Sequence, residues 1–286
     1  MTLLALVLVL IAAFVHATWN YLTKRAGGGP VFLWLFGALG TIIYMPLAIG
    51  VIIFQLPRIG TTELLFIFGS SILHLVYFLL LSYGYRISDL SLVYPLARGT
   101  GSILSTIAAI VFLGERPTPI ALLGATLIAI GVFVLIGDPK KFLGSGDHRG
   151  LTYAILTGVA IASYTLCDKY AVSTLLIPPL LMEWSINFSR TAILCPFVLN
   201  RWNDVHTEWR SHRREILGVA LLAPLSYILV LTALVFSPVS YVAPAREISI
   251  LIGTLIGTSV LAEGNAPRRL TAAFIMVIGL IALTLH

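Results

Sequence analysis

The sequence predicts an all-α membrane protein of ten transmembrane helices, arranged as two inverted repeats of five. Hydrophobic residues make up 58% of the 286 residues and charged residues only 10%, whereas an average soluble domain has about 25% charged residues. Apolar runs long enough to cross a bilayer as a helix, roughly 20 residues each, recur along the chain. Short motifs of the first half return in the second half, which is typical of transporters with a site between two repeats.

The ten spans are separated by turn-forming residues. The first turn is Gly27-Gly28-Gly29-Pro30, Pro117 and Pro119 bracket the fourth junction, and Pro178-Pro179 opens the seventh span. The longest polar segments are 138–149 and 201–214. We expect spans at about 3–22, 31–55, 63–86, 91–113, 119–137, 150–171, 178–200, 215–236, 240–262 and 267–285.

The repeat is visible in the spacing of a few motifs. Arg98 precedes Glu115 by 17 residues, and Arg246 precedes Glu263 by the same 17, at an offset of 148. The segment from Trp19 to Lys24 aligns with 164–169 at an offset of 145. The predicted organisation is therefore a first repeat over 1–138, a loop over 139–149 and a second repeat over 150–286. Five spans is an odd number, so the second repeat must enter the membrane from the opposite side.

Loop charges predict an orientation. Loops after odd-numbered spans carry 12 Lys and Arg residues, and the opposite loops carry three. The positive-inside rule then places both termini outside the cytoplasm. The 12 are Lys24, Arg25, Arg86, Lys140, Lys141, Arg149, Arg201, Arg210, Arg213, Arg214, Arg268 and Arg269, and the three are Arg58, Arg116 and Lys169.

Composition and missing motifs exclude several classes of protein. The net charge of +6 comes mostly from short loops, and no basic stripe accompanies a nucleic-acid-binding motif. Cys167 and Cys195 fall in apolar runs, so we expect no disulfide and no metal site. The sequence contains no Walker A, His-Glu-x-x-His or Gly-x-Ser-x-Gly pattern. This absence argues against transport driven by ATP and against an enzyme. We expect no cofactor. The start of the chain looks like a retained first helix, because no basic segment precedes it.

Polar side chains inside the first four spans form stripes at helical spacing, and each is costly in lipid without a role or a partner. They line a cavity in one interpretation and bond helices together in the other. His74 is also a candidate proton carrier, and Arg98 either holds a substrate carboxylate or extends to the membrane surface. The stripes are His16, Trp19 and Asn20, then Ser70, His74 and Tyr77, then Tyr94, Arg98, Ser102 and Ser105.

The second half offers similar candidates. Tyr164 aligns with Trp19 and is expected on the opposite cavity wall, while Lys169 beside Asp168 marks the membrane edge. Glu183, Asn187 and Arg190 share one face, either as an internal charge network or as a substrate anchor. Trp184 adds an aromatic face, and Arg246 occupies the place of Arg98 in the ninth span. Gly253 and Gly257 favour close helix packing, and Glu115 and Glu263 are expected to cap loops.

At this point the chain resembles the EamA branch of the drug/metabolite transporter superfamily. Ten spans in two repeats, the pair Trp19-Asn20 and the ending Phe112-Leu113-Gly114-Glu115-Arg116 of the fourth span carry the resemblance. Members export amino acids, other metabolites or drugs. The resemblance implies a basket of ten helices around a central cavity, with spans five and ten at the periphery. It also implies termini in the cytoplasm, opposite to the charge count, so both orientations stay open.

The sequence therefore predicts a secondary transporter that exports small metabolites across a bacterial-type cytoplasmic (inner) membrane. Amino acids, aromatic ones included, are the first choice of substrate, because aromatic faces outnumber charges along the predicted cavity. The alternative is an efflux carrier for drugs or quaternary amines, held by cation–π contacts; a membrane-embedded enzyme is the third class. A shortage of acids in mid-span favours facilitated export over obligate proton antiport. The expected partners are substrate and lipid, and one chain is sufficient for a ten-helix fold.

Overall fold

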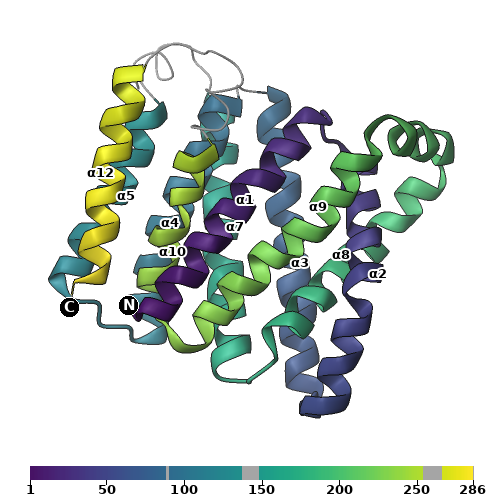
Figure 1. Cartoon of the computed structure of the whole chain (residues 1–286), viewed down its shortest axis with the longest axis horizontal. Helices are drawn as coiled ribbons and strands as arrows, with labels where there is room; N and C mark the ends of the chain where they lie inside the picture. The colour runs from purple at the N-terminus through teal and green to yellow at the C-terminus, as the bar shows by residue number, and fades with distance from the viewer. Residues whose placement is uncertain (88–89, 137–147, 254–265, 286) are drawn as a thin grey trace.

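A computed structural model describes residues 1–87, 90–136, 148–253 and 266–285 (Figure 1). Over these ranges the chain forms ten helices and no strand, which confirms the all-α prediction. The helices are α1 (Leu3–Arg25), α2 (Pro30–Gln55), α3 (Thr61–Ile87), α4 (Leu90–Leu113), α5 (Pro119–Ile136), α7 (His148–Ser173), α8 (Pro179–Leu199), α9 (Trp202–Phe236), α10 (Val239–Arg246) and α12 (Ala266–Thr284).

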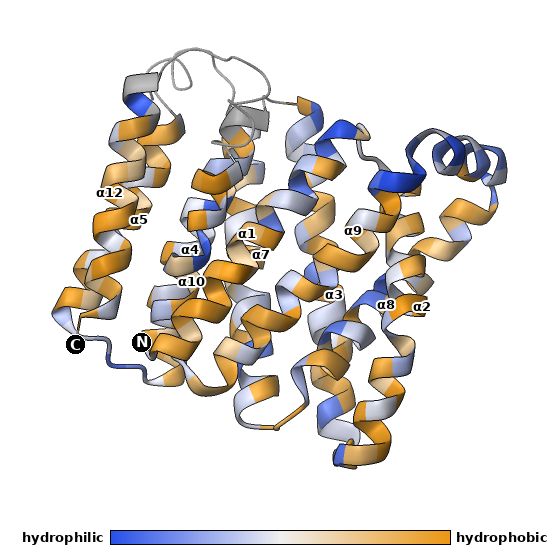
Figure 2. Cartoon of the chain, in the orientation of Figure 1, coloured by the Kyte–Doolittle hydropathy of each residue, from blue (hydrophilic) through white to orange (hydrophobic). Residues whose placement is uncertain are grey.

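Six of these helices are long and apolar enough to cross a membrane: α1, α2, α3, α4, α7 and α9. Pro119–Leu135 and Leu270–Thr284 are shorter apolar helices. Large apolar side chains lie on the outside of the bundle, including Phe54, Phe112 and Phe274, which are 87%, 77% and 67% exposed. Figure 2 shows these apolar surfaces along the helices and a hydrophilic end at one side of the molecule. Exposed apolar surface of this extent fits a lipid environment rather than water.

The first hairpin turn lies where the glycines predict it. Gly27, Gly28 and Gly29 have φ angles of 78°, 63° and 122°, a region that side chains with a Cβ disfavour. Pro30 then takes the first position of α2, where its missing N–H costs nothing and its fixed φ suits a helix. The three glycines therefore allow α1 and α2 to follow one another with a short connection.

The predicted loop over 201–214 is wrong, because this segment is helical and extends α9 back to Trp202. Its apolar side chains explain the difference: Val205 is buried, and the rings of Trp202 and Trp34 meet edge to face at 6.4 Å. A helix that buries one side can expose its charges on the other. His212, with φ −130° and ψ 26°, marks a kink at the junction with the apolar part of α9.

The predicted ninth span also differs, because α10 ends at Arg246 and helical structure resumes over 248–253. Pro244 lies inside α10 and cannot donate a backbone hydrogen bond. The Glu247 N–H bonds the Pro244 carbonyl at 3.0 Å, a tight turn that interrupts the α-helix. The rest of that span, 254–262, lies outside the described residues, as do Gly257 and Glu263.

The helices lie side by side, with α5 and α12 paired at one edge and α2 and α8 at the other (Figure 1). The edge position of α5 and α12 matches the peripheral place expected for spans five and ten. Between the edges, α4 and α3 both pack on α7, and α9 packs on α1. The two chain ends lie on the side opposite to the hydrophilic end of α9 (Figures 1 and 2). The basic residues Arg210, Arg213 and Arg214 of α9 and the termini thus lie on opposite sides of the described helices, and which side faces the cytoplasm stays a prediction.

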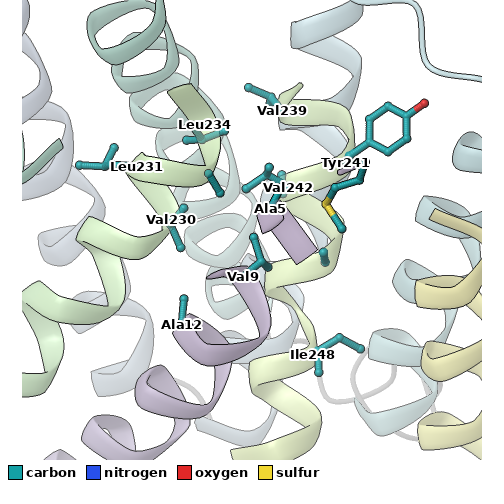
Figure 3. Packing of buried hydrophobic residues seen from close by; sticks show 14 of the residues in the cluster. Ala5, Val9, Ala12, Val230, Leu231, Leu234, Val239, Tyr241, Val242 and Ile248 are labelled. Carbon is teal, nitrogen blue, oxygen red and sulfur yellow. The ribbon is translucent and has the colours of Figure 1, made fainter. Parts of the chain in front are cut away.

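The largest apolar core fills the junction of α1, α9 and α10 (Figure 3). Small residues of α1, namely Ala5, Val9 and Ala12, face larger ones such as Leu231 and Leu234 of α9. The small side chains allow α1 to approach α9 closely, as in many membrane helix pairs. A second core holds Phe32 and Phe36 of α2 against Val219 of α9. Together these cores fix the helices that carry the polar residues described next.

Candidate functional site

A narrow polar cavity lies where α1, α4, α9 and α10 meet. Its free volume is about 10 Å³, room for about one water molecule and far below the roughly 300–1,000 Å³ of most small-molecule sites. Its polar lining is His16, Arg98, Ser226, Tyr227, Arg246 and Ser249, and Ala12, Ala13 and Val230 complete the wall. Three of the predicted site residues, His16, Arg98 and Arg246, therefore lie together. A substrate larger than this volume requires the helices to move apart.

Arg98 is held by an ion pair with Glu247. Its Nη2 lies 3.0 Å from Oε1 of Glu247, and its Nε donates to Oε2 at 3.2 Å. Both side chains are buried, so the alternative in which Arg98 extends to the membrane surface is wrong. The bidentate geometry uses the planar fork of the guanidinium, which suits a carboxylate. The pair joins α4 of the first half to the residue that follows α10 in the second half.

Arg246 has a different environment. Its guanidinium lies over the ring of Tyr227, 5.5 Å from the ring centroid, and the side chain is 8% exposed. Among the described residues it makes no ion pair within 4.0 Å. The offset of 148 explains the difference. It makes Arg246 the equivalent of Arg98, but the equivalent of Glu247 is Gly99, which has no carboxylate. Arg246 therefore lacks the acid that its counterpart possesses.

A buried carboxylate, Asp168, lies next to this cavity. Asp168 is fully buried, and it accepts hydrogen bonds from Ser70 Oγ at 2.5 Å and from the hydroxyl of Tyr227. Lys169 does reach the end of α9, where its Nζ donates to the carbonyls of Leu234 and Ser237. Successive helix residues point about 100° apart, so Lys169 can lie at the edge while Asp168 points inward.

His74 links Asp168 to an aromatic cluster. Its Nε2 lies 3.8 Å from Oδ2 of Asp168, and its ring stacks on Tyr164 with centroids 4.1 Å apart. Tyr77 meets the edge of Tyr164 at 5.6 Å, and Tyr227 meets the edge of His74 at 5.4 Å. Two more predicted residues, Tyr77 and Tyr164, are thus grouped with His74. Tyr227 belongs to both the cluster and the cavity, which makes the two features neighbours.

The remaining candidates of α1 have different partners. Trp19 donates its Nε1–H to Ser226 Oγ at 3.2 Å, and its ring meets His16 edge to face at 4.7 Å. Asn20 donates to the His16 carbonyl at 2.9 Å, within its own helix. Tyr94 of α4 is partly buried against the main apolar core. That Trp19 faces Tyr164 across a substrate stays a prediction.

Trp184 and Asn187 lie apart from this group, at the interface of α2 and α8. Trp184 donates to the Thr41 carbonyl at 3.0 Å, and Asn187 donates to the Gly37 carbonyl at 3.1 Å. Arg190 donates to Asn187 Oδ1 at 2.6 Å, which matches the interpretation of an internal polar network. Glu183 is buried in a small pocket that Trp184 and Asn187 also line. Through these hydrogen bonds, the polar and charged residues of α8 pack against α2.

Sequence reasoning missed Ser226, Tyr227 and Ser249. A signal was present, since Ser226-Tyr227 is a polar pair that follows Pro224 in a long apolar run. It was overlooked because the span carries no charge beyond Glu215 at its start. Across the described ranges, no three His, Cys, Asp or Glu side chains group as a metal site would require.

Comparisons with known proteins agree with this architecture. Residues 3–137 match the EamA-like transporter family. An uncharacterized transporter of Archaeoglobus fulgidus is 26% identical over 203 residues, covering 69% of this chain and 67% of the archaeal protein. One solved crystal structure has the same fold, with a TM-score of 0.72 and 16% identity over 98% of each chain. That structural likeness concerns the fold alone.

The apolar helices and the buried polar cavity, with these relatives, define a helical membrane transporter. The match of residues 3–137 to the EamA-like transporter family agrees with the resemblance seen in the sequence. The matches point to a transporter family and not to an enzyme family.

Proposed function

We propose that this protein is a secondary transporter that exports small zwitterionic metabolites, with amino acids, aromatic ones included, as the first choice. The observation that carries the proposal is Arg246, a buried guanidinium without an ion-pair partner among the described residues, in the wall of a polar cavity. A buried cation is costly unless it is paired. A substrate carboxylate supplies the missing partner by a bidentate contact.

The other parts of an amino acid also find suitable neighbours. Asp168 lies beside the cavity through its shared contact with Tyr227 and can attract an ammonium group. The rings of Trp19 and Tyr164 approach the same region from α1 and α7 and offer faces for an apolar or aromatic side chain. Cation and carboxylate lie on different helices, so a zwitterion would bridge them.

Two inverted five-helix repeats, over 1–138 and 150–286, are part of this proposal. The packing of α5 on α12 supports them. A Cβ built on Gly124 would lie 2.6 Å from the Gly279 oxygen, and one on Gly131 would lie 3.1 Å from the Ala272 oxygen. The two contacts are equivalent, because the offset of 148 relates Gly124 to Ala272 and Gly131 to Gly279. A twofold axis between two antiparallel helices produces such reciprocal contacts.

The order of helix packing gives independent support. If α1 to α4 correspond to α7 to α10, each contact should have a counterpart. The contact of α3 with α7 corresponds to the contact of α9 with α1. The contact of α4 with α7 corresponds to the contact of α10 with α1. α8 likewise packs on α3 as α9 packs on α2. In transporters built this way, the substrate site lies between the repeats, where Arg98, Arg246 and Glu247 meet.

The test is counterflow into liposomes that contain the purified protein and an unlabelled amino acid. We expect labelled aromatic and aliphatic amino acids to accumulate, and Arg246→Lys to raise the half-saturating concentration about tenfold, as loss of one bidentate contact implies. Arg246→Gln should lower uptake further. The control is Arg116→Gln, since Arg116 is exposed in a loop. Undiminished uptake by both Arg246 variants would contradict a carboxylate contact.

A cationic drug or quaternary amine is the second candidate substrate. It is favoured by the buried carboxylate of Asp168, which lies among the rings of His74, Tyr164 and Tyr227. Aromatic faces and one carboxylate suit a cation that brings no carboxylate of its own. In the same assay, uptake of a cationic dye that is insensitive to Arg246→Gln but lost in Asp168→Asn would favour this class over amino acids.

The cytoplasmic membrane of a bacterial-type cell is the proposed location. The orientation with termini outside is supported by the loop charges, which lie on the side opposite to both chain ends. Cysteine labelling from each side of intact cells tests the orientation: Ser211→Cys and Thr2→Cys should react from opposite sides.

A further inference from the structure

We propose that His74 and Asp168 form a proton-binding site that couples transport to proton movement. The inference rests on the proposed transport function and adds its driving ion. It revises the expectation of facilitated export, which assumed a shortage of buried acids, because Asp168, Glu183 and Glu247 are all buried among the described helices.

The hydrogen bonds of His74 fix which of its ring nitrogens carries a proton. Nδ1 lies 2.9 Å from the Ser70 carbonyl oxygen and 3.2 Å from Ser70 Oγ. A carbonyl oxygen can only accept a hydrogen bond, so Nδ1 must be the donor. In a neutral imidazole, Nε2 then has no proton and presents a lone pair. Nε2 lies 3.8 Å from Oδ2 of Asp168.

An ionised Asp168 would also present only lone pairs toward His74. Its Oδ1 is occupied by the hydroxyl of Ser70, and its Oδ2 receives the hydroxyl of Tyr227. Two acceptors that face each other in a buried site repel, and a single proton between them removes the repulsion. The proton can reside on Asp168 or on Nε2 of His74; in either case the pair carries no net charge. Without the proton, the pair carries one negative charge.

The charged and titratable groups around the pair are distributed over five helices. Arg246 lies over the ring of Tyr227, the residue that donates to Asp168, so a cation adjoins the pair. The groups that face the pair are Tyr77 of α3, Tyr164 and Cys167 of α7, Glu183 and Arg190 of α8, Tyr227 of α9 and Arg246 of α10.

The site can couple to transport because its atoms belong to separate helices. Ser70 and His74 lie on α3, Asp168 on α7 and Tyr227 on α9, and Tyr227 also lines the polar cavity. Alternating access moves helices of the two halves relative to one another. Such a movement changes the distance between the two acceptors and therefore the affinity for the proton. Linkage requires that the proton in turn changes the affinity for substrate.

The first experiment measures proton binding without any substrate. Infrared difference spectra of the purified protein, recorded between acidic and alkaline buffer, report the carbonyl band of a protonated carboxyl group. We expect one component of this band to disappear in Asp168→Asn and to shift in His74→Phe, which keeps a ring to stack on Tyr164. Asp204→Asn changes an exposed acid of α9 and serves as the control. Identical spectra for wild type and both site variants would overturn the proposal.

The second experiment measures coupling in liposomes that contain a pH-sensitive dye. An outward amino-acid gradient should shift the internal pH with wild type. Asp168→Asn should move at least about tenfold fewer protons per molecule of labelled substrate, a ratio measured over whatever counterflow remains after the proposed ammonium contact is lost. Should Asp168→Asn fail to fold or to transport, His74→Phe takes its place in both experiments.

The outcomes separate this inference from the proposed function. Counterflow by wild type without any pH shift, or uptake that follows a sodium gradient at fixed pH, would overturn proton coupling and leave the transport function intact. If no amino acid or dye moves at all, the proposed substrate classes fail. The infrared result then decides by itself whether His74 and Asp168 hold a proton.

Discussion

Glu115, in the loop after α4, caps the N-terminus of α10 through Ser240. Its Oε2 accepts from the Ser240 N–H at 2.9 Å and from the Ser240 hydroxyl at 2.6 Å, and its Oε1 accepts from the Val239 N–H at 2.7 Å. A carboxylate at this position satisfies orphan N–H groups and suits the positive end of the helix dipole. The predicted capping role of Glu115 is therefore confirmed.

Replacing Glu115 should destabilise the protein. Glu115→Ala removes all three hydrogen bonds, and loss of a helix cap costs about 0.5–2 kcal/mol. The melting temperature of the protein in detergent, followed by tryptophan fluorescence, measures the effect. Arg116→Ala, an exposed neighbour, should leave the melting temperature unchanged. Equal melting temperatures for the two variants would show that the cap contributes nothing.

The contact between α5 and α12 should tolerate no side chain at Gly124. The added methyl group of Gly124→Ala would lie 2.6 Å from the Gly279 oxygen and 2.9 Å from the Leu283 nitrogen, which are backbone atoms. The helices must separate, and overpacking of this kind costs about 1–3 kcal/mol. Gly50→Ala is the matched control, because nothing lies within 4 Å of its added Cβ. We expect its thermal stability to be unchanged or raised by up to about 1 kcal/mol, as the helix propensity of alanine implies.

Breaking the ion pair between Arg98 and Glu247 should be more harmful than breaking one at the surface. Glu247→Gln leaves a buried guanidinium without its carboxylate, a loss of about 3–5 kcal/mol. Arg25 and Glu215 form the comparison pair at 3.4 Å, with Arg25 65% exposed, and Glu215→Gln should cost at most about 1 kcal/mol. The double variant Arg98→Met/Glu247→Leu should recover most of the stability. Thermal melts of the four proteins decide, and similar losses at both pairs would contradict the burial argument.

Trp19 should matter for transport through both its ring and its N–H group. Trp19→Ala is expected to lower counterflow about tenfold at unchanged membrane expression, because an aromatic contact and a hydrogen bond are each worth about 1 kcal/mol. Trp19→Phe, which loses only the bond to Ser226, should have an intermediate rate. Phe14→Ala lies on the exposed face of the same helix and should transport normally. A similar decrease in Phe14→Ala would mean that the substitutions act on helix packing.

The sequence predicts the fold well because the bilayer imposes simple rules on it. The lengths of the apolar runs predict the bounds of most helices to within a few residues. The offset of 148 predicts that Arg98 and Arg246 occupy equivalent positions in the two halves. The segment 201–214 was missed because its charges concealed Val205, which is buried, and Trp202, whose ring meets that of Trp34. Such a helix has too few apolar residues to be recognised as a membrane span.

The partners of the polar residues were harder to predict. Periodicity shows which residues share a face of one helix, but it does not show which helices meet. Glu247 follows Arg246 directly in the chain, yet it pairs with Arg98 on another helix. The sequence places Lys169 at the membrane edge but does not identify the partners of Asp168. Its three partners lie on α3 and α9, far away in the chain, so no local pattern connects them.

The reciprocal glycine contacts of α5 and α12 also determine when the fold can be completed during synthesis. α5 enters the membrane early, and its glycine face has no partner until the last helix leaves the ribosome. Until then, that face is in contact with lipid or with whatever insertion factor shields it. A chain that terminates before α12 would expose a helix surface able to bind a neighbouring nascent chain. α12 therefore completes the packing around the glycine face of α5, and a variant that lacks α12 would leave that face uncovered.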